Sequence, residues 1–219
     1  MSVGRALRAA LVDGYQHSLK LLVLNVGLSV AVVAILLAAS YVQAALLLIV
    51  LVGPLAAALM HCTLTLVRTE DLHLSEALTG LRLHWRRGLQ LALLAIAGIW
   101  LGIFAVRFYA RAGTFAWPLA ILAGYLLVLF GVLQLVLWPL AVDQRERSLR
   151  AILGEAAMIL IRRPGAHLGL GLALLLVNAI LAIAILPPLT LTVAYSFLAA
   201  AHFARPRQVI QEVETAWRR

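Results

Sequence analysis

Long apolar stretches, separated by short polar segments, make up most of this chain. Six of these stretches contain no Asp or Glu, and they are about as long as the ~20 residues that a helix needs to cross the hydrocarbon core of a bilayer. The pattern predicts an all-α, polytopic membrane helix bundle with six transmembrane spans. The predicted spans cover residues 21–39, 42–67, 89–106, 115–142, 168–185 and 189–204.

The basic residues predict the orientation of this bundle. All Lys and Arg residues except Arg107 and Arg111 fall on one side of the six predicted spans. Because Lys and Arg in short loops tend to stay in the cytoplasm, we expect this side to be cytoplasmic. Both termini are then cytoplasmic, and the two exceptions lie in the outer turn between spans three and four.

Polar segments on the cytoplasmic side contain apolar residues at helical spacing. This spacing predicts an amphipathic helix within residues 68–88 that ends at Gly88, and a second one within residues 143–167 that is capped by Ser148. The same spacing in residues 1–20 predicts a short interfacial helix. The apolar faces are Leu74, Leu78, Leu81 and Trp85 in the first connection, Leu149, Ile152, Leu153, Ala156 and Leu160 in the second, and Val3, Ala6, Leu7, Ala10 and Leu11 at the N-terminus.

Composition agrees with a lipid environment. The chain is 64% hydrophobic and only 12% charged, with a mean hydropathy of +1.01, and a soluble domain of this length cannot bury so much apolar surface. The net charge of +9 would suggest nucleic acid only if it formed a patch on a soluble surface. The charges instead flank apolar runs, so the expected partner is the lipid bilayer and no nucleic acid is expected. Residues 1–219 are predicted to form a single membrane domain.

The polar residues inside the predicted spans offer little chemistry. No Asp, Glu, Lys or Arg lies deep in a span, whereas ion-coupled transporters usually hold a carboxylate near mid-membrane. No nucleophile–base pair or metal-ligand set is visible, so we expect no catalytic residue, no cofactor and no metal site. Asn25, Gln134 and Asn178 are candidates to line a polar pocket. The alternative is that these three amides form hydrogen bonds between helices that fix the packing.

Two histidines and the only cysteine lie toward the cytoplasmic ends of their spans. His61, Cys62 and His202 would form a metal site if the fold brought them together. No HxxxH or CxxC spacing is present, which favours histidines that are hydrogen-bonded to their neighbours.

Other residues are candidates for packing and for interaction. Gly98 and Gly102 form a GxxxG pair that lets another helix approach closely, and we expect that helix to be a span of the same chain rather than a second copy. The exposed arginines of the cytoplasmic connections are candidates for a partner surface or an anionic lipid surface. These arginines are Arg82, Arg86, Arg87, Arg162 and Arg163.

Several short motifs occur in a characteristic order. They are Leu21–Asn25 at the start of span one, Gly53–Leu59, Arg68–Asp71, His84–Gly88 and Arg162–Gly165. In these motifs the chain resembles the YesL-like bacterial integral membrane family, whose function is undefined. The resemblance implies a bacterial inner-membrane protein with an accessory role, because family members are often linked to carbohydrate uptake systems, and it supplies no catalytic residue.

Together these features predict a non-enzymatic accessory or interaction protein of the inner membrane, associated with membrane transporter subunits. The alternative is a small-molecule binding or permeation subunit of a transporter, in which the three amides line the pocket. The sequence leaves the ligand, the partner and the oligomeric state open.

Overall fold

The computed structural model describes residues 3–41, 52–69, 73, 75–183 and 193–204. All regular secondary structure in these residues is helical, in agreement with the predicted all-α class. The helices are α1 (Val3–Gln16), α2 (Ser18–Tyr41), α4 (Val52–Thr69), α5 (Ser75–Arg111), the short 3-10 helix η1 (Thr114–Ala116), α6 (Trp117–Asp143), α7 (Leu149–Arg162), α8 (Pro164–Ile183) and α9 (Val193–Ala204).

Some of these helices have the length and composition of membrane spans. Among the described residues, α2, α4, α5 and α6 are each long and apolar enough to cross a membrane, and the pair α7–α8, bent by 98°, adds a fifth if it counts as one span. These helices suggest a membrane protein, while six spans stay a prediction. Residues 42–51 of predicted span two, 184–185 of span five and 189–192 of span six lie outside the described residues.

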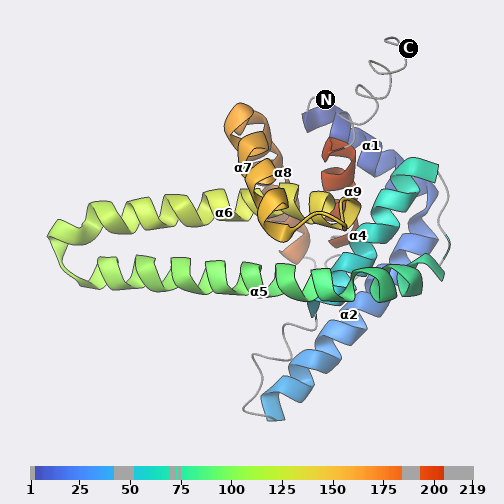
Figure 1. The fold of residues 1–219 in the computed structure, drawn as a ribbon, viewed down its shortest axis with the longest axis horizontal. Coiled ribbons are helices and arrows are strands. Elements are labelled where there is room, and N and C mark those ends of the chain that lie inside the picture. The colour runs from blue at the N-terminus through green and yellow to red at the C-terminus, as the bar shows by residue number, and fades with distance from the viewer. Residues whose placement is uncertain (1–2, 42–51, 70–72, 74, 184–192, 205–219) are drawn as a thin grey trace.

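The most extended part of the structure is the α5–α6 hairpin. Figure 1 shows the two helices side by side, extending away from the other helices. The connection at its tip contains Gly113, whose φ of 103° favours glycine. With 37 residues, α5 has a length of about 55 Å. This exceeds the roughly 30 Å hydrocarbon core of a bilayer, so a spanning α5 would extend beyond it.

Large apolar side chains are exposed along both helices of this hairpin. Contiguous apolar surface on this scale is rare in monomeric soluble proteins, and it is the surface that lipid requires. The exposed side chains are Leu93, Ile99, Trp100, Leu101, Ile103, Phe104 and Phe108 on α5, and Leu119, Ile121, Leu122, Tyr125, Leu126 and Val128 on α6.

Helices α1, α2, α4 and α8 share a core with α9, which is rich in alanine. Ala194, Leu198, Ala199 and Ala201 of α9 are buried in a core that also receives side chains from α1, α2, α4 and α8. Small side chains let helices approach closely. The predicted N-terminal interfacial helix is therefore part of this core, because α1 packs against α9 and buries Ala10 there.

Helices α4 and α5 approach each other backbone to backbone through two glycines. A Cβ on Gly53 would lie 2.3 Å from the Gly88 carbonyl oxygen, and one on Gly88 would lie 2.7 Å from the Gly53 oxygen and from backbone atoms of Pro54. The prediction that a cytoplasmic helix ends at Gly88 is wrong, since α5 runs through this position without a break. Gly88 serves close packing with α4 rather than helix termination.

The first turns of α5 also bury a different face from the predicted one. Gly80, His84 and Gly88 are buried toward α4, whereas Leu78 and Trp85 are exposed. Leu74, another member of the predicted face, lies outside the described residues. Two small residues in place of large ones allow the close contact with α4, which explains why this face is the buried one.

In α7 the centre of the predicted apolar face is buried, and Leu160 at its end is half-buried. Ile152 and Ala156 are fully buried with Leu137 and Ala141 of α6, and Leu149 and Leu153 pack against this cluster. The predicted N-cap is confirmed, because the Ser148 hydroxyl accepts a hydrogen bond from the Ala151 amide at 3.3 Å.

Candidate functional site

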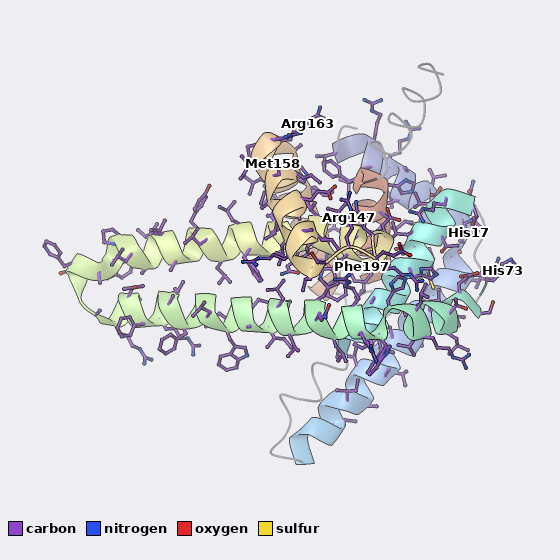
Figure 2. All side chains as sticks on the ribbon, viewed as in Figure 1. His17, His73, Arg147, Met158, Arg163 and Phe197 are labelled. Carbon is purple, nitrogen blue, oxygen red and sulfur yellow. The ribbon has the colours of Figure 1, made fainter. Side chains whose placement is uncertain are left out.

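A cavity of about 450 Å³ lies where the C-terminal part of α4, the start of α5 and the turn after α6 meet. Figure 2 shows Arg147 in this region, at the end of the hairpin that joins the other helices. Most of the residues that line the cavity are polar or charged. The titratable ones are His61, Arg68, His84, Asp143, Arg145, Glu146 and Arg147.

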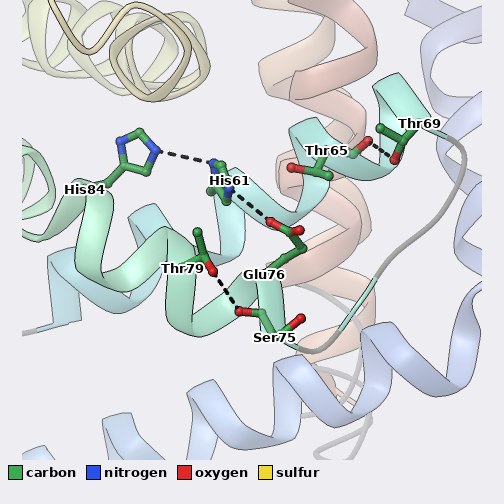
Figure 3. Close-up of polar contacts among 7 residues, drawn as sticks. All are labelled: His61, Thr65, Thr69, Ser75, Glu76, Thr79 and His84. Atoms are coloured by element: carbon green, nitrogen blue, oxygen red, sulfur yellow. Dashed lines mark hydrogen bonds and ion pairs between the residues drawn. The ribbon is translucent and has the colours of Figure 1, made fainter.

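Two histidines and a glutamate form a chain at one side of this cavity (Figure 3). The His61 Nδ1 atom lies 3.3 Å from His84 Nε2, and His61 Nε2 lies 3.5 Å from Glu76 Oε2. Gly80 makes room for the His61 ring, because a Cβ at this glycine would lie 3.0 Å from His61 Cβ. A hydrogen bond between two imidazoles needs one N–H and one lone pair, so the two rings must adopt complementary tautomers or share a proton.

His84 is the most buried member of the chain, with 2% of its surface exposed. Its Nε2 atom faces His61, and its Nδ1 atom is buried without a hydrogen-bond partner among the described residues. Leaving a polar atom in this condition typically costs about 1–3 kcal/mol. The ring of His84, a residue that also lines the cavity, therefore keeps an unpaired polar atom.

Arginines hold the turn between α6 and α7 in place. The Arg68 side chain forms an ion pair with Asp143 at the end of α6. Arg87 of α5 donates from Nη2 to the carbonyl oxygens of Arg145 and Arg147, at 2.8 and 2.5 Å. These contacts attach the turn to both α4 and α5. The cavity therefore lies between three elements, α4, α5 and the turn after α6, that are bonded to one another.

A second cavity, of about 600 Å³, adjoins the first and shares Leu83, Arg145 and Glu146 with it. It adds Arg86 and Arg87 of α5 to the lining. Arginines outnumber carboxylates among the residues that line the two cavities, so this end of the structure has a positive potential.

The three amides that the sequence selects as a candidate pocket have different surroundings. The Asn25 Oδ1 atom accepts a hydrogen bond from the Ala194 amide at 3.3 Å, and Asn178 Nδ2 donates to Ser196 Oγ at 3.1 Å. Both amides thus bond to α9. The Gln134 amide atoms are buried and have no hydrogen-bond partner among the described residues. The two cavities described above are not lined by any of the three, and a pocket formed by them stays a prediction.

Gly98 and Gly102 face α6 of the same chain. A Cβ on Gly98 would lie 2.3 Å from a ring atom of Phe130, and one on Gly102 would lie 2.6 Å from Leu127 Cδ1. Both glycines therefore contribute to packing within the hairpin.

The arginines that the sequence suggests as a partner or lipid surface lie in two separate places. Arg82 and Arg86 are exposed on α5, where the Arg86 guanidinium lies 5.9 Å from the centroid of the Trp85 ring. Arg162 and Arg163 are exposed where α7 ends. Arg87 differs from these four, because it is half-buried and bonded to the α6–α7 turn.

Sequence reasoning missed the pairing of His61 with His84. These residues are 23 positions apart on two helices, and the only signal in the sequence was the spacing that places His84 on one helical face with Gly80 and Gly88. His202, which would have to approach His61 and Cys62 to form the metal site considered above, contacts Asp13 of α1 at 2.7 Å. Comparisons with models of protein families, with curated proteins and with solved structures found no match to this chain.

Proposed function

We propose that this chain is a non-enzymatic integral protein of a bacterial inner membrane that presents its arginine-rich end to a partner protein in an accessory role. The observation that carries this proposal is the contrast along the α5–α6 hairpin. Apolar side chains are exposed over most of its length, and arginines gather at the end that joins the other helices. Lipid suits the first part, and an aqueous phase with an anionic partner suits the second.

The proposed topology has six spans and places this arginine-rich end in the cytoplasm together with both termini. The distribution of Lys and Arg supports this orientation. The resemblance to the YesL-like family supports a transporter subunit of a carbohydrate uptake system as the partner. The exposed strip on α5 that contains Arg82, Trp85 and Arg86 is the proposed contact, because Trp and Arg are enriched among the residues that contribute most to protein interfaces.

Site-specific photo-crosslinking in native membranes tests the proposed contact. A photoreactive amino acid in place of Arg82 is expected to give one discrete adduct, because Arg82 is exposed on the proposed surface. The same replacement at Arg111, an exposed arginine at the other end of α5, is the matched control and is expected to give no such adduct. Absence of an adduct at position 82, or the same adducts from both positions, would contradict the proposal.

A further inference from the structure

The cavity between α4, α5 and the α6–α7 turn has the donor set of an anion site. Three arginines line it, Arg68, Arg145 and Arg147, together with His84. The four residues come from three separate elements, so the fold and not the local sequence brings the three arginines and the imidazole of His84 together. Burial, with His61 and nearby arginines, lowers the pKa of His84 to about 4, so its ring is neutral near pH 7.

The arginines retain donors for a ligand. A guanidinium has five N–H groups. Arg68 uses Nη2 for its ion pair with Asp143, and Arg147 uses Nη1 for Gln144 and Glu155. The Arg145 guanidinium makes no hydrogen bond or ion pair with the part of the chain that the structure describes, and only its carbonyl oxygen is engaged. Arg145 is therefore the most available donor, and it also lines the adjoining cavity.

The buried ring of His84 is a second observation that points to an anion in this cavity, independent of the arginines. Figure 3 shows the two ring nitrogens of His84 on opposite sides, with one directed toward His61. The other, Nδ1, has no partner among the described residues. When His61 donates a hydrogen bond to His84 Nε2, the proton of the neutral His84 ring lies on Nδ1, which is then a donor. This arrangement requires protons on both nitrogens of His61, which then donates from Nδ1 to His84 and from Nε2 to the Glu76 carboxylate, 3.5 Å away.

We infer that this cavity binds a phosphate group, as a monoester or a diester, through Arg68, Arg145, Arg147 and His84. Tetrahedral phosphate oxygens accept several charge-assisted hydrogen bonds at once, and arginine matches them better than other side chains do. Asp143 and Glu146 also line the cavity, but Asp143 is neutralised by its pair with Arg68. This site goes beyond the proposed function and does not depend on whether a partner docks on α5.

Thermal unfolding of the purified full chain in a non-ionic detergent tests the site. One arm adds inorganic phosphate or glycerol phosphate at constant ionic strength, and the other adds phosphatidylglycerol to the micelles, with diacylglycerol, which has no phosphate, as its reference. A ligand that binds only the folded form raises the melting temperature. A response to the soluble phosphates assigns a free phosphate compound, and a response only to phosphatidylglycerol assigns a lipid headgroup.

Two matched variants locate the binding. Arg145→Gln is expected to weaken the apparent affinity for the responding probe by about tenfold, since it removes a charge-assisted hydrogen bond to the phosphate. Arg163→Gln removes an equally exposed charge outside the cavity and is expected to leave the affinity unchanged. No stabilisation in either arm would overturn the inference, as would equal weakening by the two variants.

Discussion

Replacement of Gly88 by Val is expected to separate α4 from α5 and to lower the free energy of unfolding by about 3 kcal/mol or more. The new Cβ would lie 2.7 Å from the Gly53 carbonyl oxygen and from the Pro54 backbone. These are backbone atoms that cannot rotate away, so one helix has to shift. Thermal or denaturant unfolding of the purified variant in detergent measures the change.

The control is the same substitution where space is open. Gly131 lies within α6, and a Cβ at this position would meet no atom within 4 Å. Gly131→Val makes the same change in helix propensity as Gly88→Val, so the difference between the two variants isolates the steric contact. Gly131→Val is expected to change the stability by less than about 1 kcal/mol. Equal losses in the two variants would contradict the glycine contact between α4 and α5.

Truncation of Leu91 to Ala is expected to cost about 2–4 kcal/mol. Leu91 is fully buried in the cluster that joins α5 to α6 and α7. Removal of its side chain leaves a cavity next to Leu137 and Ile152, which are also fully buried. The same unfolding measurement gives the size of the loss.

Leu101 is the matched comparison, because it is 70% exposed on the same helix. If lipid or detergent surrounds this part of the hairpin in both the folded and the unfolded protein, the Leu101 side chain has similar surroundings in the two states. Leu101→Ala then changes the free energy of unfolding little. We expect a loss below about 1 kcal/mol, as for substitutions away from the packed core. A loss as large as that of Leu91→Ala would mean that Leu101 is packed against protein, and the hairpin would then not face lipid at this position.

The elements that the sequence predicts well are those with large apolar residues at helical spacing. The burial of Ile152 and Ala156 in α7 follows directly from this pattern, and so does the cap at Ser148. The same reasoning predicts α6 closely, since span four was expected at 115–142 and the helix covers Trp117–Asp143, whereas α5 extends beyond the predicted span at 89–106 in both directions. A hydropathy pattern reports which residues avoid water, and it does so most clearly in helices with one apolar face.

The same pattern fails for the contact between α4 and α5. That contact depends on Gly53, Gly80 and Gly88, which have almost no hydropathy signal and are read from sequence as helix ends or turns. The hydropathy pattern therefore predicts Leu78 and Trp85 on the apolar face of the helix, whereas both are exposed in the structure.

The candidate site could not be predicted for a related reason. The pairing of His61 with His84 follows from the approach of α4 to α5, and the position of Arg145 and Arg147 follows from the bonds that Arg87 makes to their carbonyl oxygens. These are long-range consequences of packing. From the sequence, the arginines could be assigned only to the cytoplasmic connections. The fold shows which of them share a cavity.

Cysteine labelling in intact cells tests the proposed membrane topology most directly. Cys62 is the only cysteine and is buried, so a Cys62→Ala background allows Thr114→Cys and Ser148→Cys to report on opposite ends of the hairpin, where both residues are exposed. With a membrane-impermeant maleimide, Thr114→Cys is expected to react in intact cells, and Ser148→Cys only after the membrane is opened. Reaction of Ser148→Cys in intact cells, or equal reactivity at the two positions, would contradict a hairpin that crosses the membrane with its arginine-rich end in the cytoplasm.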